Sequence, residues 1–520
     1  MRATDAIAPT FPDHLEMSPM GLLKTSLGTA AEHLGVLFST RFARTVLLLL
    51  LATGLSTCSR NPATGERQLS LYSTQQEIQM GRQSDESIVR AMGIYEDEDL
   101  QSYVSEMGQE MAALSERPDL PWTFRVVDEP AINAFALPGG FIYVTRGILA
   151  HFNSEAQLAA VVGHEIGHVT ARHSVNQISR QQLAGLGLGI GSILSPEIAQ
   201  FQNLIGAGLQ LAFLSFSRED ERESDMLGFR YMVQAGYDPR EMPDVFNMLS
   251  RASEGGSRVP EWLSTHPNPE NREQDIEQRI AAYEGDLSDL VVDRAEYLRL
   301  LDGIPFGDDP RNGYFIDRTF LHPDLRFRFD FPSGWQVVNQ AQQVAGQPEG
   351  GNAMISLRFA EGTSAQAALE SFVQESGVQV VDRQSDEING LIAQWARFRA
   401  ETQQGALAGT VAFVEYGGQV YQLMGLSTAD RIGQYRGVIE STLSSFDSLR
   451  EPSLLDVEPR RIQLVELPRD MSLAEFDREY PSSIPLQRIA VMNQVREGDT
   501  LQAGELYKRV VGEGPPQAIP

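Results

Sequence analysis

Cysteine and basic residues are both scarce in this chain. Cys58 is the only cysteine among 520 residues, which excludes an intramolecular disulfide framework. Lysine and arginine together number 42 against 70 aspartates and glutamates, so the formal net charge is −28. Because nucleic acid binds to a basic protein face, this balance argues against a nucleic-acid partner. It fits instead the soluble body of an exported protein.

Long apolar runs are also lacking. The glycine-rich stretch 183–216 is interrupted by Ser195, Pro196 and Glu197. Neither half reaches the roughly 20 apolar residues that are needed to span a bilayer. We expect a mobile helical hairpin that covers a cleft, with glycines providing the flexibility. Contact with a membrane surface is the alternative.

The N-terminal region has the pattern of an export signal. Arg41 and Arg44 precede the short apolar run 46–52, and the signal ends at Cys58. We expect Cys58 to be lipidated, which places the protein on the periplasmic side of the cell envelope as a membrane-anchored lipoprotein, with the outer membrane favoured. Thr57 differs from the small residue usual before a lipidated cysteine. A plain signal peptide or a short anchor is therefore the alternative.

The strongest chemical signal is an HExxH motif formed by His164, Glu165 and His168. On a helix, residues i and i+4 project from one face, so the two histidines can bind a single ion. Glu165 then lies beside that ion, where it can deprotonate a water without coordinating the metal. Good helix formers lead into the motif from Ser154, a candidate N-cap, and no proline follows before Pro196. Chance occurrence on a solvated helix is the alternative, but the apolar neighbours of the motif indicate a buried helix.

A catalytic zinc needs a third protein ligand. His173 lies half a turn out of phase with His164 on an ideal helix, so we expect a structural role for it. The acidic run downstream offers a better donor, because Glu221 and Asp225 are spaced i, i+4 and can share one helix face. Asp225 would then orient a ligand histidine. A solvated helix start, where acids suit the helix dipole, is the alternative.

These motifs resemble those of the zinc metallopeptidases that include HtpX, BepA and the CAAX prenyl protease. In that family HExxH precedes a helix reading S-R-x-x-E-x-x-A-D, and this chain reads S-R-E-D-E-R-E-S-D up to Asp225. The resemblance makes Glu221 the third zinc ligand and Asp225 the acid behind a ligand histidine. Residues 133–144 are similar to the family's strand beside the cleft, and residues 264–267 to its His-Pro signature. The likeness covers about residues 60–300.

The same resemblance implies a role for the histidine of the His-Pro segment. In the BepA-like branch this histidine, here His266, can approach the zinc and hold the enzyme latent. A general alternative is that His266 or Arg272 steadies the oxyanion. A third interpretation is that His266 and Pro267 merely end a loop ahead of a helix at 269–283.

The predicted activity is hydrolysis of peptide bonds with Zn2+ as cofactor. Glu165 is expected to act as the general base and then to pass the proton to the leaving amine. Residues 141–145 alternate bulky side chains and predict a short strand. As an edge strand it would pair with an extended polypeptide, which favours unfolded substrates. An ordinary core strand is the alternative.

We predict an α+β multidomain chain. After an N-terminal extension with a lipoprotein-type signal (1–58) and a tether (59–75), a mainly helical, gluzincin-type metallopeptidase domain with a small sheet covers 76–303. An α+β sandwich, weakly similar to the PsbP type, covers 313–450. A β-α-α-β tail at 460–512 resembles a LysM module, which makes peptidoglycan a candidate partner. No repeat of about 34 residues is present, so the helical-repeat tail of BepA-like enzymes is absent.

Two function hypotheses from different classes follow. The first is a zinc endopeptidase of the bacterial cell envelope that hydrolyses unfolded or misassembled exported proteins. The second is a non-catalytic envelope scaffold or chaperone-like binding protein that acts through its C-terminal modules. The presence of every catalytic residue type favours the enzyme.

Overall fold

The structure is a computed structural model that describes residues 58–188, 212, 214–254, 260–267, 269–375, 377–402 and 405–516. The expected export signal and most of the expected hairpin at 183–216 lie outside these residues. Two compact units divide the chain, Met1–Ser59 and Arg60–Pro520. Strand β1 (Cys58–Arg60) crosses the boundary, and every later element belongs to the second unit. Among the described residues, no helix is both long and apolar enough to cross a membrane.

A three-stranded sheet lies at the centre of the peptidase segment, in the order β3 (Thr123–Val127), β5 (Phe141–Thr145), β4 (Ala134–Leu137). β5 pairs in parallel with β3 and antiparallel with β4, and all five of its residues are buried. The idea that residues 141–145 form an edge strand is therefore wrong, because both sides of this strand are occupied. The two edge strands of this sheet are β3 and β4. The outer edge of β3 is partly occupied, because Ile94 forms an antiparallel bridge with Val127.

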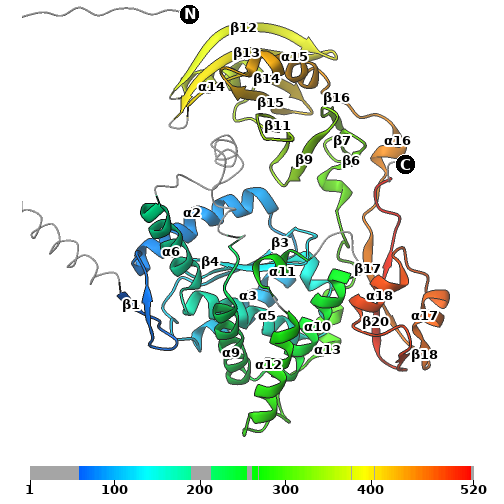
Figure 1. Cartoon of the computed structure of the whole chain (residues 1–520). Coiled ribbons are helices and arrows are strands. Elements are labelled where there is room, and N and C mark those ends of the chain that lie inside the picture. Colours follow the sequence, from blue (N-terminus) through cyan, green and yellow to red (C-terminus); the bar gives the residue numbers. More distant parts are fainter. Residues whose placement is uncertain are drawn as a thin grey trace, which may run out of the picture. The chain divides into compact units, whose positions relative to one another are not determined.

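Helices surround this sheet (Figure 1). They are α2 (Thr74–Met92), α3 (Glu98–Ala113), α4 (Arg146–Leu149), α5 (Glu155–Thr170), α6 (His173–Leu188), α9 (Arg218–Ala235), α10 (Met242–Glu254), α11 (Glu261–Thr265), α12 (Pro269–Ala282) and α13 (Arg294–Leu300). The HExxH helix α5 begins at Ser154, whose side chain accepts a hydrogen bond from the backbone amide of Gln157. That contact satisfies one of the free amides at the helix start.

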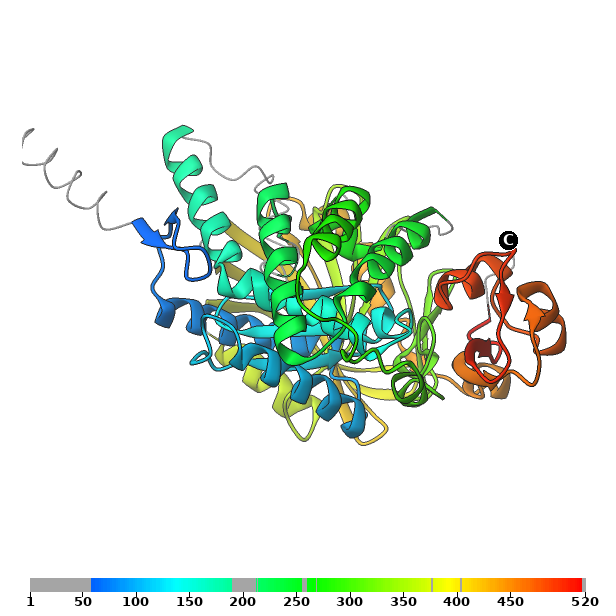
Figure 2. The ribbon, with the colours of Figure 1, turned by 90° about the horizontal axis from the view of Figure 1, so that it is seen from below.

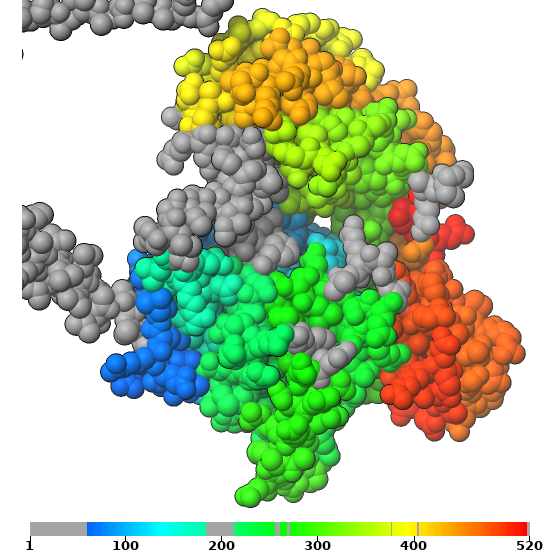
Figure 3. Space-filling model, in the orientation of Figure 1, coloured from blue at the N-terminus to red at the C-terminus, as the bar shows by residue number. Residues whose placement is uncertain are grey.

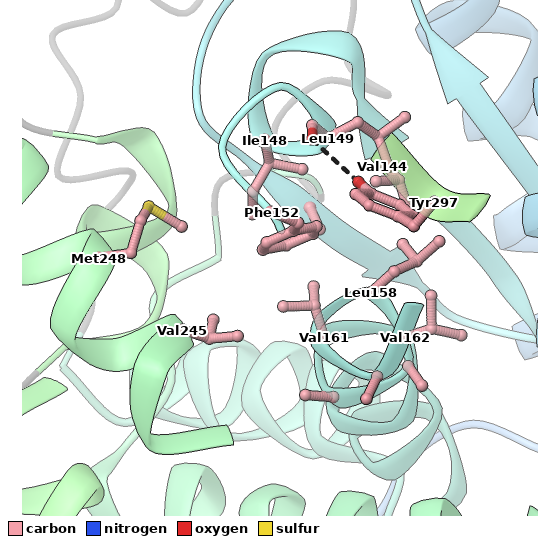
Figure 4. Packing of buried hydrophobic residues seen from close by; sticks show 14 of the residues in the cluster. Val144, Ile148, Leu149, Phe152, Leu158, Val161, Val162, Val245, Met248 and Tyr297 are labelled. Carbon is pink, nitrogen blue, oxygen red and sulfur yellow. Dashed lines mark hydrogen bonds between the residues drawn. The ribbon is translucent and has the colours of Figure 1, made fainter. Parts of the chain in front are cut away.

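Helix α5 lies inside the domain, and all of its residues except Glu155 are buried. Figure 4 shows Val161 and Val162 of this helix beside Phe152 and Tyr297 in the core. The Tyr297 hydroxyl donates a hydrogen bond of 2.9 Å to the carbonyl of Leu149, which satisfies its only buried polar atom. A helix buried on all sides needs partners for its polar side chains, because an unpaired buried polar group is costly.

Helices α5 and α9 cross at very short range. A Cβ atom added to Gly163 would lie 3.3 Å from the Cα of Gly228, and one added to Gly228 would lie 3.0 Å from the backbone nitrogen of His164. Ser224 faces Gly167 in the same way, with its Cα 3.1 Å from an added Cβ. The three glycines therefore permit the close contact that brings side chains of α9 to the HExxH motif.

Helix α5 does not continue to His173, although the phase argument assumed one ideal helix through that residue. It ends at Thr170, and Arg172 adopts a left-handed conformation with φ of 64°. The Arg172 guanidinium donates a 2.5 Å hydrogen bond to the buried carboxylate of Glu77, which Arg117 also contacts at 2.8 Å. This buried ion cluster holds the reversal in place, and α6 starts at His173 in a new direction.

Residues 313–450 form two sheets and two helices. A seven-stranded sheet has the order β12-β13-β14-β15-β11-β10-β9, and a four-stranded sheet has the order β16-β8-β7-β6. Their bounds are β6 Tyr314–Ile316, β7 Thr319–His322, β8 Phe327–Asp330, β9 Trp335–Gln340, β10 Gln343–Pro348, β11 Ala353–Phe359, β12 Val378–Ile388, β13 Leu391–Thr402, β14 Gly405–Tyr416, β15 Gln419–Thr428 and β16 Asp447–Ser448.

Strand β14 shows how the two faces of the large sheet are used. Ala412 and Val414 share a core with helix α15 (Ile432–Leu443), whereas Val411 and Phe413 share another with helix α14 (Ala365–Gln374). Alternate residues of a strand point to opposite faces, so a helix covers each face.

The C-terminal segment is a small module with the predicted β-α-α-β order (Figure 2). Strands β17 (Arg461–Glu466) and β20 (Leu506–Val511) pair antiparallel, with helices α17 (Leu473–Glu479) and α18 (Leu486–Met492) between them in sequence. The short strands β18 (Met471–Ser472) and β19 (Thr500–Leu501) form a second pair.

This module shares one continuous hydrophobic core with the peptidase segment. Its surface is drawn in orange and red in Figure 3. The fully buried Nζ atom of Lys508 donates hydrogen bonds of 2.8 and 2.7 Å to the carbonyl oxygens of Ala150 and Phe152. Gln494 donates to the carbonyl of His151 at 3.0 Å. These hydrogen bonds hold the module against residues 150–152, which lead into α5.

Candidate metal centre

Helix α5 places two imidazoles on one side of the HExxH motif. The Nε2 atoms of His164 and His168 lie 2.9 Å apart, and both side chains are buried. The i, i+4 spacing on a continuous helix accounts for this convergence. Two ring nitrogens that face one point in this way are suited to share an ion.

Helix α9 delivers a carboxylate to the same point. It begins with a capping box in which Ser217 and Asp220 exchange hydrogen bonds, and Glu221 follows one residue later. The Glu221 oxygens lie 3.6 Å from Nε2 of His164 and 3.5 Å from Nε2 of His168. Burial alone would raise the pKa of Glu221, but the charges of His266 and Arg272 hold it well below its usual value. The carboxylate is therefore in its ligand form.

A third imidazole comes from the end of helix α11. Nδ1 of His266 lies 3.2 Å from Nε2 of His164 and 3.0 Å from Oε1 of Glu221. Its ring stacks on Trp262 with ring centres 4.7 Å apart. Each of the four residues His164, His168, Glu221 and His266 offers one ligand atom, and these atoms lie within 4.8 Å of one another.

Asp225 and Arg272 form a second layer behind these ligands. Oδ1 of Asp225 lies 2.9 Å from Nδ1 of His164, as expected of an acid that orients a ligand imidazole. The Arg272 guanidinium donates hydrogen bonds of 2.7 and 2.6 Å to Asp225 and lies 2.7 Å from Glu221. It also packs over the rings of Trp262 and Phe246, each with a centre 4.7 Å away. Arg272 is thus directed at the two acids.

His173 lies in this layer too, contrary to its expected position. Its Nδ1 atom is 3.0 Å from Nδ1 of His168, and its Nε2 atom is 3.2 Å from Oε2 of Glu223. The phase argument assumed one straight helix, and the reversal at Arg172 removes that assumption. The proximity of the two imidazoles could not be found from helix periodicity.

The pKa values of the site histidines move in opposite directions. Burial lowers the pKa of His168 well below its usual value, which keeps its imidazole neutral. Burial would also lower the pKa of His266, but the carboxylates of Glu221 and Glu165 outweigh it and raise that pKa. Neutral imidazole is the form that ligates metal.

The donor set suits a zinc ion. Two imidazoles and one carboxylate are a typical catalytic zinc set, in which a fourth position holds water or substrate. Both carboxylate oxygens of Glu165 are buried without a hydrogen-bond partner among the described residues, and the nearest cationic group is Nε2 of His266 at 3.5 Å. Such a group is costly unless something absent from the protein itself, such as a water beside an ion, satisfies it. The residues present therefore fit the metal.

Comparison with known proteins shows a family to which the segment that holds this site is similar. Residues 98–280 match the model described as peptidase family M48. The matched segment includes the HExxH motif, Glu221, Asp225, His266 and Arg272.

Two curated relatives each match part of the chain. The β-barrel assembly-enhancing protease of Escherichia coli (strain K12) is 33% identical over 296 residues, which is 55% of this chain and 57% of the relative. The mitochondrial metalloendopeptidase OMA1 of Arabidopsis thaliana is 38% identical over 168 residues, which is 32% of this chain and 33% of the relative. The chain thus spans between a third and just over half of the length of these relatives.

Among solved structures, the cyanobacterial PsbP protein of Synechocystis sp. PCC 6803 is similar to part of this chain. The similarity covers 26% of this chain and 94% of the PsbP chain. The PsbP chain is 13% identical, with a TM-score of 0.22.

Proposed function

We propose that this chain, whose residues 98–280 form a peptidase family M48 domain, is a zinc-dependent endopeptidase of the bacterial cell envelope. The family match and the relatives confirm the predicted resemblance to metallopeptidases of the HtpX and BepA type. One observation carries the proposal. Donor atoms of His164, His168 and Glu221 converge from two separate helices next to the unpartnered carboxylate of Glu165.

Each residue has a role that follows from its position. His164, His168 and Glu221 would hold the zinc ion, while Asp225 fixes the ring of His164. When bound, zinc would supply Lewis-acid chemistry at this point, which polarises a peptide carbonyl and acidifies a water molecule. Glu165 accepts the proton from that water and then donates it to the leaving amine. Burial of the whole site excludes bulk water, which strengthens these charge interactions.

His266 closes the site in this form of the enzyme. Its Nδ1 atom lies beside the donor atoms of His164 and Glu221, at the point where these donors converge. Its Nε2 atom lies 3.5 Å from Oε1 of Glu165. An imidazole there competes with water and substrate, so the enzyme is latent until His266 moves. We favour this role over that of an oxyanion donor, because the ring faces the ligands and the catalytic carboxylate.

The substrate is an extended, unfolded polypeptide. Strand β4 is one of the two edge strands of the three-stranded sheet, and α5 packs against it. The chain entering β4 also contacts the His266 segment, since the amide of Trp262 donates to the carbonyl of Ile132 at 3.2 Å. A free strand edge beside the metal site can pair with a peptide backbone. Only a flexible or unfolded segment can adopt the extended form that such pairing needs.

Two observations support the physiological setting that we propose, the name of one relative and the export-type N-terminus. One relative is named a β-barrel assembly-enhancing protease, so we propose unfolded or misassembled exported proteins as substrates here. Cys58 would carry a lipid and hold the protein at the periplasmic side, with the outer membrane favoured. Peptidoglycan binding by residues 460–512 is a separate proposal, which pull-down with purified cell wall would test.

The decisive experiment compares Glu165→Gln with the original protein on casein at matched zinc occupancy. We expect a loss of turnover of roughly 10²- to 10⁴-fold with unchanged zinc affinity, because Glu165 moves the proton but does not bind the metal. Glu219→Gln is the control, since it makes the same chemical change at an exposed carboxylate of α9. Unchanged turnover of Glu165→Gln, or activity that resists removal of zinc by a chelator, would overturn the proposed zinc mechanism. Absence of casein hydrolysis by the original protein with zinc bound would favour the non-catalytic scaffold.

A further inference from the structure

His164 and His168 differ in the group that contacts the outer ring nitrogen, Nδ1, of each imidazole. Asp225 contacts the outer nitrogen of His164 directly. The outer nitrogen of His168 instead meets another imidazole, that of His173, at 3.0 Å. Glu223 lies beyond that imidazole at 3.2 Å. His168 and His173 are 0% and 2% exposed, so water does not separate the two rings.

We infer that His173 is a positioning residue for the metal centre, which sets the ring orientation and tautomer of His168 and is itself fixed by Glu223. The inference rests on the proposed zinc site. It assigns a function to a histidine that lies outside the HExxH motif and contributes no atom to the ligand set.

The proton inventory of the three residues is consistent with one arrangement. With Nε2 of His168 directed at the other ligands, its Nδ1 atom carries the ring proton and donates it to Nδ1 of His173. His173 then carries its own proton on Nε2, which donates to the carboxylate of Glu223. Each donor in this series has one acceptor. The hydroxyl of Ser224 is also within hydrogen-bond distance of this imidazole, 3.2 Å from Nδ1 of His173.

Backbone structure fixes His173 in this place at a cost. Arg172 has a φ of 64°, a conformation unfavourable for a residue other than glycine. Its side chain is tied to Glu77 of α2 and to the carbonyl of Tyr72 at 2.6 Å. Strain that is held by such specific contacts commonly accompanies functional positions. Here its result is that α6 begins with an imidazole facing His168.

Glu223, at the outer end of this series of hydrogen bonds, is also held by a partner of its own. Asn61 donates a hydrogen bond of 2.6 Å to Oε1 of Glu223, and Asp220 lies 3.7 Å from Nε2 of His173. The aromatic ring of Phe216 covers His168, with ring centres 4.0 Å apart. Outer-layer partners of ligating histidines commonly contribute 10- to 100-fold to metal affinity.

The test is zinc affinity, measured by competition with a chromophoric chelator, in the full chain. His173→Phe keeps a ring of similar size but removes the acceptor, and we expect zinc affinity to fall about 10- to 100-fold. His173→Asn places an amide oxygen near the position of Nδ1, so we expect it to restore affinity to within about threefold. Glu223→Gln should give a smaller loss, and Glu219→Gln, the same charge change at an exposed position of α9, should give none.

Cobalt supplies a second readout that a merely structural role would not move. The d–d absorption of bound Co2+ reports ligand geometry, so His173→Phe should shift it and His173→Asn should preserve it. If both variants bind zinc like the original protein and keep the cobalt spectrum, His173 only fills space and the inference fails. If the original protein itself binds no zinc, the proposed function fails first, and the two failures are thus distinguishable.

Discussion

Nδ1 of His266 lies 3.0 Å from Oε1 of Glu221, although the two residues come from different helices separated by 45 positions in sequence. The charge of Glu221 raises the pKa of His266, and the charge of His266 helps to lower that of Glu221. The imidazole is therefore held electrostatically at the ligand cluster as well as by stacking on Trp262.

Removal of this imidazole is expected to activate the enzyme. His266→Phe retains a ring to stack on Trp262 but offers no nitrogen, so casein hydrolysis should rise several-fold while zinc binds more weakly. Turnover per bound zinc is the measurement. A fall in turnover at unchanged zinc affinity would contradict latency and identify His266 as an oxyanion donor, and no change in either quantity would leave it as a loop residue.

Arg272 should contribute more to the free energy of unfolding when zinc is absent than when zinc is bound. Arg272→Met leaves Asp225 and Glu221 buried without their shared cation, which we expect to lower the free energy of unfolding by about 3–5 kcal/mol. Excess zinc should restore part of this loss, because the ion neutralises Glu221. Denaturant unfolding with and without zinc is the measurement.

The control for Arg272 is Arg222→Met, which breaks an exposed ion pair with Asp275 and should cost less than about 1 kcal/mol. Equal destabilisation of Arg272→Met with and without zinc would show that Arg272 serves packing rather than the charge balance of the site.

Glu129 should make stability depend on pH. Burial, assisted by Glu261 and Asp308, raises its pKa to about 7. The folded protein therefore retains a proton that the unfolded chain releases. The resulting stabilisation is complete below about pH 4.5 and is lost as the pH rises through 7, an effect on the order of 2–3 kcal/mol.

Glu129→Gln mimics the protonated carboxyl, so it should raise the melting temperature at pH 8 and leave it nearly unchanged at pH 4.5. Glu284→Gln, at an exposed position, should show no such difference between the two pH values. An equal shift at both pH values would mean that the carboxyl of Glu129 does not titrate in this range.

The hydrogen bonds of the buried Lys508 side chain should hold the C-terminal module in place. Lys508→Met leaves the carbonyl oxygens of Ala150 and Phe152 without their hydrogen bonds, at a cost of about 2 kcal/mol. We expect limited proteolysis to release a C-terminal fragment faster than from the original protein. Arg488→Met, at an exposed position of α18, should leave the rate unchanged. Equal rates for all three proteins would show that the shared hydrophobic core suffices.

Local sequence signals mark the starts of both helices that carry the ligands and the end of α9. Ser154 caps α5 and Ser217 caps α9, while Gly236 ends α9 in a left-handed conformation. These features depend on residues a few positions apart, which is why the sequence discloses them. The spacing of HExxH likewise predicted that two imidazoles converge.

Contacts between distant segments could not be predicted in this way. The reversal at Arg172 depends on Glu77, which lies 95 positions earlier, and arginine is not a residue that normally signals a left-handed turn. The central place of β5 depends on its pairing with β3 as well as β4. Periodicity within residues 141–145 is the same for a central strand and an edge strand.

The hydrogen bond from Asn61 to Glu223 bears on how the protein should be shortened for expression. A version trimmed to start at residue 70 would retain every residue of HExxH and of helix α9, yet it would lose the outermost support of His173. We expect such a protein to purify with less zinc, although all of its metal ligands are present. Shortened versions intended for metal analysis or crystallisation should therefore begin upstream of Asn61.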